Sequence, residues 1–288
     1  MGIAHDWASG FDSPEHRRLW YAGDRQAAVL VHGYPGSPAE MRPLAEALHR
    51  AGWTVRVPLL PGMGPELESL DRHTREDWVE AVRAEWRWLA EGHQPVLLVG
   101  YSLGAAIAMQ VATEERVPAL ALIAPMQRLE GLAFGWLWPA VRRLVPRVRP
   151  FRHLIDFYDP HTRDALARYA PGLDLDDPAV RAGIRDYAVS TRLLDEVVQL
   201  GREALAQAPC YMNPTLVVQA REDRVISRAA TLRLVGRLGG AVRYEEVPGT
   251  HDIVTPGCLG WEDVESAVLR FAWDAWQPAS GLKLPQMH

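Results

Sequence analysis

Short runs of apolar residues alternate along the chain with segments in which apolar residues recur at helical spacing. The apolar runs predict six buried strands, at residues 27–32, 53–57, 95–101, 117–124, 214–220 and 241–247. Helices are expected at residues 39–51, 74–91, 103–114, 227–238 and 261–276. Strands that alternate with helices form a parallel sheet covered on both faces, so we expect an α/β protein with a mostly parallel central sheet.

The alternation stops between residues 124 and 214. Connections in compact α/β units are typically about 2–6 residues long, and this stretch is far longer. We therefore expect residues 126–213 to form an inserted helical cap, and residues 1–125 and 214–288 to form the core. Residues 277–288 read as a loose tail.

Composition narrows the function classes. The chain has 288 residues, of which 48% are hydrophobic and 23% charged, as in an ordinary globular protein. Its formal net charge of −5 argues against a dedicated nucleic-acid-binding protein. Two cysteines cannot build a disulfide framework, and there is no Cys-x-x-Cys pair for structural zinc. Neither a phosphate-binding loop nor a dinucleotide fingerprint is present, so no metal or cofactor is expected.

The sequence also bears on the compartment. Its first ten residues lack the basic and apolar regions of a signal peptide, and no run of 18 apolar residues could span a bilayer. A soluble, cytoplasmic protein is expected. The sequence leaves open a transient contact with a membrane surface, and it does not fix the oligomeric state.

The motif GYSLG at residues 100–104 lies between an expected strand and an expected helix of small residues. This is the setting of a G-x-S-x-G nucleophile elbow, in which a serine occupies a strained turn. Glycines at both ends remove side chains that would clash, and the following helix N-terminus favours developing negative charge. The motif therefore indicates Ser102 as a nucleophile, with a tight structural turn as the alternative.

A serine nucleophile needs a base, and the base needs an acid that orients it. On this kind of fold the chain order is serine, acid, histidine. Of the ten histidines, only His251 and the terminal His288 follow the last expected strand, and His251 stands just beyond it. Glu222 and Asp223 both follow the preceding strand. Asp223 is the preferred acid, and Glu222 is then a surface carboxylate.

The oxyanion of a tetrahedral intermediate needs two backbone N–H donors. One is expected from Leu103, the residue after the nucleophile. The other is expected from the loop after the first strand, where Pro35 has no N–H and Tyr34 is the natural donor. His32, at the end of that strand, is interpreted as an imidazole that braces the loop rather than as a catalytic group.

Five motifs follow one another in a fixed order: HGYPGSP at 32–38, LLPGMG at 59–64, GYSLG at 100–104, PTLVVQAREDRVI at 214–226 and PGTHDIVT at 248–255. Together they resemble the α/β-hydrolases, and more closely bacterial carboxylesterases and monoacylglycerol lipases. The resemblance implies an α/β-hydrolase fold with an inserted cap over the acyl pocket. It also implies a triad of Ser102, Asp223 and His251, and an oxyanion hole made by the Tyr34 and Leu103 amides.

The start of the expected cap is rich in aromatic residues. Trp136 and Trp138 are candidates for lining an acyl-chain tunnel, and packing of the cap on the core explains them equally well. An arginine cluster follows, with members Arg142, Arg143, Arg147, Arg149 and Arg152. A solvated cap face is favoured for this cluster over a site for anionic lipid or a substrate carboxylate.

The expected function is a serine hydrolase acting on a small-molecule carboxylic ester with an apolar acyl chain, of small or medium length or a monoglyceride. A peptidase, a thioesterase, a C–C hydrolase and an acyltransferase on the same triad stay open. An epoxide hydrolase is disfavoured because such relatives carry an aspartate where Ser102 stands. A non-catalytic binding protein is disfavoured by the intact Ser, Asp and His set, although fold alone does not exclude it.

Overall fold

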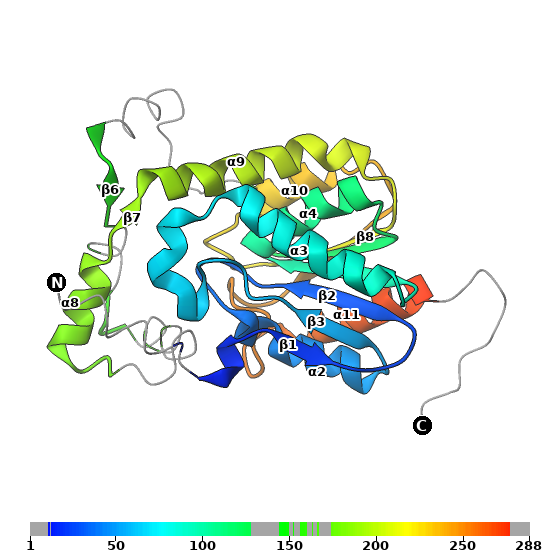
Figure 1. The fold of residues 1–288 in the computed structure, drawn as a ribbon, viewed down its shortest axis with the longest axis horizontal. Coiled ribbons are helices and arrows are strands. Elements are labelled where there is room, and N and C mark those ends of the chain that lie inside the picture. The colour runs from blue at the N-terminus through cyan, green and yellow to red at the C-terminus, as the bar shows by residue number, and fades with distance from the viewer. Residues whose placement is uncertain are drawn as a thin grey trace.

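The computed structural model describes Phe11 and residues 13–127 and 174–276, together with residues 144–149, 152, 156–159, 163 and 166. Seven strands form one sheet in the order β1-β3-β2-β4-β5-β8-β9 (Figure 1). Their bounds are β1 Leu19–Tyr21, β2 Ala27–Val31, β3 Thr54–Val57, β4 Val96–Tyr101, β5 Ala119–Ile123, β8 Thr215–Ala220 and β9 Val242–Val247. Only the β1–β3 pair is antiparallel, which confirms the expected mostly parallel sheet.

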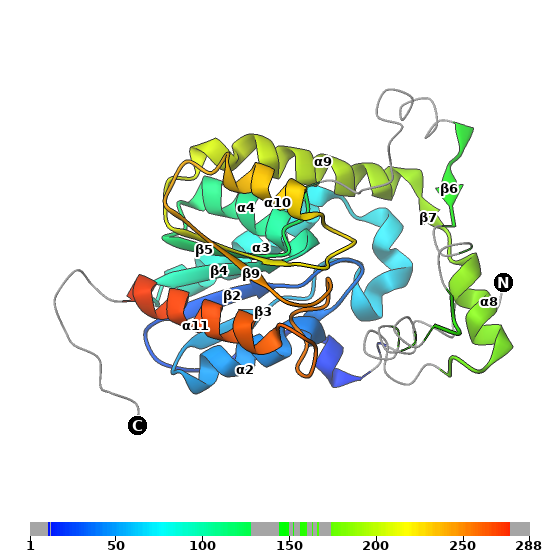
Figure 2. The same ribbon diagram turned by 180° about the vertical axis from the view of Figure 1, so that it is seen from behind.

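Helices cover both faces of this sheet. One face carries α2 (Arg42–Arg50) and α11 (Trp261–Trp276), which lie side by side in Figure 2. The opposite face carries α3 (Arg75–Ala90), α4 (Leu103–Glu115), α9 (Thr191–Gln207) and α10 (Arg228–Val235). Four 3₁₀ segments complete this part of the chain: η2 Pro14–His16, η3 Pro38–Met41, η4 Gly64–Arg72 and η5 Ala208–Cys210.

The central strands are apolar on both sides because both sides are covered. All six residues of β4 are buried. Successive side chains point to opposite faces, so Leu98 packs with α3, α4 and α9, whereas Leu97 and Val99 pack with α2 and α11. This double burial explains the continuous apolar runs in the sequence.

Helix α3 begins with a capping box at Thr74. The Thr74 hydroxyl accepts a hydrogen bond from the Asp77 N–H at 3.4 Å, and the Asp77 carboxylate accepts one from the Thr74 N–H at 2.8 Å. Trp78 is fully buried on the inner face. The single helix expected at residues 39–51 is instead divided into η3 and α2, because Pro38 and Pro43 each stand at the start of a helical segment.

Strand β1 is absent from the sequence-based prediction. It is only three residues long, and Trp20 in its middle remains 45% exposed, so it leaves no run of buried positions. Its pairing with β3, in which Trp20 lies opposite Arg56, is a contact between distant parts of the chain. Local pattern does not report such a contact.

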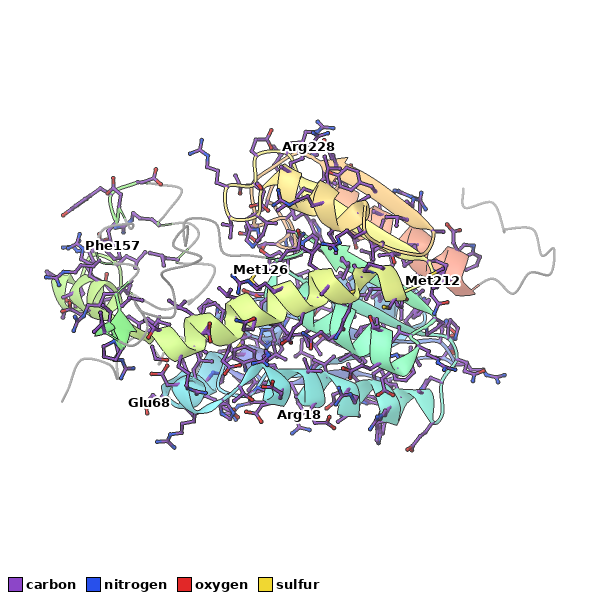
Figure 3. All side chains as sticks on the ribbon, turned by 90° about the horizontal axis from the view of Figure 1, so that it is seen from above. Arg18, Glu68, Met126, Phe157, Met212 and Arg228 are labelled. Carbon is purple, nitrogen blue, oxygen red and sulfur yellow. The ribbon has the colours of Figure 1, made fainter. Side chains whose placement is uncertain are left out.

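The described residues of the predicted cap fall into two groups. Helix α9 packs along α4, with Leu193, Val197 and Leu200 in the hydrophobic cluster of that face. Helix α8 (Pro178–Asp186) contributes to a separate small cluster with Phe157, and β6 (Arg147–Val148) pairs with β7 (Val189–Ser190). In Figure 3, Phe157 lies beyond one end of α9 and Met212 beyond the other. The boundaries 126–213 of the cap stay a prediction.

Candidate active site

Ser102 stands in a sharp turn between β4 and α4. Its backbone angles are φ 52° and ψ −116°, a conformation that is strained for residues other than glycine. Such backbone strain costs about 1–3 kcal/mol. A Cβ on Gly104 would overlap the carbonyl oxygens of Val31 and His32, and one on Gly100 would overlap the start of α4. Only glycine fits at either position, as the elbow motif requires. Ser102 is 9% exposed.

The structure brings Ser102, His251 and Asp223 into one hydrogen-bonded chain. His251 Nε2 lies 3.1 Å from Ser102 Oγ, and His251 Nδ1 lies 2.8 Å from Asp223 Oδ2. The three residues follow β4, β9 and β8, at the carboxyl ends of these strands. With the Nδ1 hydrogen donated to the aspartate, the free lone pair of the imidazole faces the serine hydroxyl.

The carboxylate of Asp223 is fully buried, and four groups donate hydrogen bonds to it. One oxygen accepts the N–H groups of Val225 and Ile226, both at 2.8 Å, and the other accepts Gln219 Nε2 at 3.1 Å in addition to His251. Burial alone would raise the pKa of Asp223, but the hydrogen bond and charge of His251 and the two backbone donors outweigh it and lower that pKa. Asp223 therefore remains ionised beside the imidazole.

Glu222, the alternative acid, binds the backbone of Gly249 instead of the imidazole of His251. Its carboxylate accepts the N–H of Gly249 at 2.7 Å, and its own N–H donates to the Gly249 carbonyl at 3.0 Å. These bonds tie the loop after β8 to the loop that carries His251. Asp223 rather than Glu222 reaches the imidazole.

The loop after β2 lies directly against Ser102. A Cβ built on Gly33 would stand 3.3 Å from the Ser102 Cβ. No described residue accepts a hydrogen bond from the N–H of Tyr34 or of Leu103. Leu103 is also the first residue of α4, whose dipole favours negative charge at this end.

His32 holds this loop by two hydrogen bonds. Its Nδ1 donates to the Gly33 carbonyl at 2.9 Å, and its Nε2 accepts the N–H of Leu60 at 3.2 Å. Burial lowers the pKa of His32 to about 4, so the ring stays neutral with the hydrogen on Nδ1. Since the carbonyl and N–H of a trans peptide point in opposite directions, fixing the Gly33 oxygen also fixes the direction of the Tyr34 N–H.

Sequence reasoning missed two residues that contact Asp223 or His251. Gln219 donates to Asp223 and is itself held by the Thr231 hydroxyl, which donates to Gln219 Oε1 at 2.6 Å. A polar residue inside the otherwise apolar run at 216–220 is a signal that could have revealed it. Tyr101 donates to the His251 carbonyl at 3.1 Å, with the two rings 5.3 Å apart. No local pattern marks that contact.

The structure describes some of the remaining residues that the sequence singled out. Trp136 and Trp138 lie outside the described residues, as do Arg142 and Arg143. Arg147 pairs with Asp71 at 2.6 Å and Arg149 with Asp186 at 3.8 Å, and both side chains are at least half exposed. Those two arginines thus have carboxylate partners on a solvated face. The described residues contain neither a metal-binding group of His, Cys, Asp or Glu nor a helix long and apolar enough to cross a membrane.

Comparison with known proteins identifies a family for this chain. A family model described as the Alpha/beta hydrolase family matches residues 28–258, which is most of the chain. The chain belongs to the alpha/beta hydrolase family. The expectations of an α/β-hydrolase fold and of a hydrolase enzyme are therefore confirmed.

Two curated relatives of this alpha/beta hydrolase are similar in sequence. A thermostable monoacylglycerol lipase of Bacillus sp. (strain H-257) is 40% identical over 198 residues, which are 69% of this chain and 70% of the relative. A carboxylesterase of Bacillus subtilis (strain 168) is 30% identical over 92 residues, 32% of this chain and 37% of the relative. The predicted resemblance to bacterial carboxylesterases and monoacylglycerol lipases is confirmed.

A solved structure gives the same fold. A chain from the structures of LipS and LipT, two metagenome-derived lipolytic enzymes, aligns with a TM-score of 0.71 and 23% identity, over 91% of this chain and 98% of that one. At this identity the likeness concerns the fold alone.

Proposed function

We propose that this alpha/beta hydrolase is a serine carboxylic-ester hydrolase of the carboxylesterase and monoacylglycerol lipase kind. The observation that carries the proposal is the hydrogen-bonded chain from Ser102 through His251 to Asp223 at a strained elbow. The relatives support the reaction class, since they are a lipase and a carboxylesterase.

The proposed reaction has two halves. Ser102 Oγ attacks the ester carbonyl carbon while His251 Nε2 takes the hydroxyl proton. The bond to the alcohol then breaks, and His251 returns that proton to the departing alkoxide. Water, deprotonated by His251, attacks the acyl carbon of the resulting acyl-enzyme. The bond to Ser102 Oγ then breaks, and His251 returns the proton to this oxygen as the acid leaves. Asp223 holds the useful imidazole tautomer and stabilises its cationic form in both halves.

The oxyanion formed in each half is assigned to the N–H groups of Tyr34 and Leu103. Leu103 follows Ser102 in the chain, and Tyr34 follows Gly33, whose built Cβ would stand 3.3 Å from the Ser102 Cβ. Neither N–H has an acceptor among the described residues. Donors that are already oriented cost no reorganisation when charge develops, which makes such a hole one of the largest contributions to catalysis.

The proposed substrate is an ester with an apolar acyl chain, of small or medium length or a monoglyceride. The 40% identity to a monoacylglycerol lipase supports the monoglyceride. The predicted cap at residues 126–213 leaves the sheet after β5 and rejoins it at β8, the strand that precedes Asp223. We propose that this cap covers the acyl pocket, with Trp136 and Trp138 as its acyl-contacting residues.

A fluorophosphonate probe tests the nucleophile. We expect the label on the peptide that contains Ser102 and no label on the Ser102→Ala variant. That variant should lose ester hydrolysis by about 10⁶-fold, as other serine hydrolases do when the nucleophile is removed. Near-normal turnover by Ser102→Ala would refute the assignment.

A substrate panel tests the reaction class. Aryl esters of increasing chain length and monoglycerides should be hydrolysed, whereas matched peptide amides should not. Adding an alcohol separates hydrolysis from acyl transfer, because a transferase would form the new ester in place of the free acid. A faster reaction with amides or thioesters than with the matched esters would contradict the proposal.

A further inference from the structure

Glu40 places a carboxylate behind the loop that carries Tyr34. It belongs to η3, directly after that loop, and its side chain turns back toward β2. Its Oε2 accepts the N–H of Gly33 at 2.9 Å. The N–H of the residue before Tyr34 is therefore bound to a side chain.

The loop wraps around this carboxylate on a second side. A Cβ on Gly36 would collide with the carboxyl carbon and both oxygens of Glu40, so the main chain of Gly36 lies flat against the group. No side chain other than hydrogen fits at residue 36 while Glu40 keeps its place. Gly33 and Gly36 thus contact the same carboxylate from the two ends of the loop.

Glu40 is also close to the nucleophile. A Cβ built on Gly33 would lie 3.4 Å from Glu40 Oε2 and 3.3 Å from the Ser102 Cβ. One residue of main chain therefore separates the carboxylate from the serine. Any change at Glu40 that moves Gly33 therefore also moves the main chain that lies against Ser102.

This is a costly place for a carboxyl group. Burial raises the pKa of Glu40 to about 7, the Gly33 N–H opposes that rise, and Asp252 adds to it. Asp252, from the loop after β9, and Tyr101, at the end of β4, are the titratable groups that face it. A glutamate on the surface would avoid this cost of burial. We therefore look for a function that requires a hydrogen-bond acceptor at this position.

We propose that Glu40 is a positioning residue for the oxyanion hole, which acts by holding the Gly33 N–H while His32 holds the Gly33 carbonyl. The two contacts fix two successive peptides on either side of a flexible glycine. The Tyr34 N–H, which belongs to the second of these peptides, is thereby directed at the position of the oxyanion. The inference rests on the proposed function, because it assigns Glu40 to the same site.

The contribution required of Glu40 is an acceptor oxygen of the right reach, and its charge is secondary. Glutamine supplies such an oxygen on a side chain of nearly equal size, whereas alanine supplies none. The pair of variants Glu40→Ala and Glu40→Gln therefore separates the acceptor from the charge. Glu91→Gln, at an exposed position at the end of α3, is the matched control for loss of a carboxylate.

The experiment measures kcat and KM for an aryl ester, and Ki for a trifluoromethyl ketone that forms an oxyanion adduct on Ser102. We expect Glu40→Ala to lower kcat by about tenfold to a hundredfold with little change in KM, less than the 10²–10³ that loss of a hole donor costs. Its Ki should rise by the same factor as kcat/KM falls, since the adduct resembles the transition state. Glu40→Gln should recover most of the loss, and Glu91→Gln should match the wild type.

Circular dichroism and thermal unfolding establish that each variant is folded, and if Glu40→Ala does not fold, Glu40→Ser replaces it. An alanine or serine variant with wild-type kcat and Ki would overturn the inference. An equal loss in Glu40→Gln would overturn it too, because the charge rather than the acceptor would then matter. If Ser102→Ala is inactive in the same assays, either result leaves the proposed function standing.

Discussion

The carboxyl of Glu40 makes the stability of the fold depend on pH. Its pKa is raised from 4.5 to about 7 on folding, so the folded state holds this proton more tightly than the unfolded chain does. Between these two values stability falls as pH rises, and the full loss is present above about pH 7. An ion-paired carboxylate with a lowered pKa, such as Asp223, has the opposite dependence.

The size of the effect follows from the shift. One pKa unit is about 1.4 kcal/mol, so the ionised carboxyl costs about 3 kcal/mol at pH 8 and less than about 1 kcal/mol at pH 5. Glutamine resembles the protonated acid and carries no such cost. Glu40→Gln should therefore be more stable than the wild type by about 3 kcal/mol at pH 8, and nearly equal to it below pH 5.

Thermal and urea unfolding of the wild type, Glu40→Gln and Glu91→Gln at pH 5 and pH 8 measure this difference. For a chain of this size about 1 kcal/mol shifts Tm by roughly 2–4 °C, so a gain of several degrees is expected at pH 8. The control variant should show no comparable gain. A Glu40→Gln gain that is the same at both pH values, or that appears only at pH 5, would refute the reasoning.

Two further pairs of variants test the site and its support. Asp223→Asn should lower kcat by about 10⁴, because the wrong imidazole tautomer then faces the serine, whereas Glu222→Gln keeps its backbone contact and should stay near wild type. Gly104→Ala should prevent native folding, since its Cβ would overlap the Val31 carbonyl, and soluble yield and Tm measure this. Gly92→Ala, where a Cβ meets nothing within 4 Å, should change stability by no more than about 0.5 kcal/mol.

Each pair has an outcome that contradicts it. If Glu222→Gln loses activity and Asp223→Asn does not, the assignment of the acid is reversed. A Gly104→Ala protein with wild-type Tm and turnover would show that the elbow can move aside. The backbone crowding described at Ser102 would then have no functional consequence.

The sequence predicts the parts of the fold and site that local pattern controls. Central strands such as β4 are continuous apolar runs because both faces are covered, and the elbow at Ser102 needs glycine at fixed distances. Chain order and strand ends predict His251 and Asp223 as the candidate base and acid. The strands and the elbow are predictable because each pattern lies within one short segment of the sequence.

What the sequence does not predict depends on contacts between segments. β1 exists because it pairs with β3, and its three residues carry no pattern of their own. Glu40 reads as an ordinary polar residue in a helical turn, and only the folded loop turns it toward Gly33. Gln219 is intermediate, because a polar residue in a buried strand signals a partner without identifying Asp223.

The packing of α9 has a consequence for how such a hydrolase could acquire new specificity. Its apolar side chains lie in the same cluster as α4, and Arg75 of α3 binds Glu196 and Glu203 on its polar side. A Cβ on Gly201 would meet the main chain of Gln127 at 2.5 Å, so this helix also clamps the chain where it leaves the sheet. A chimera with another lid should therefore exchange residues up to 189 and retain Thr191–Gln207. Grafts joined at that point would change the substrates that reach Ser102. They would leave the packing of α9 against α4 unchanged.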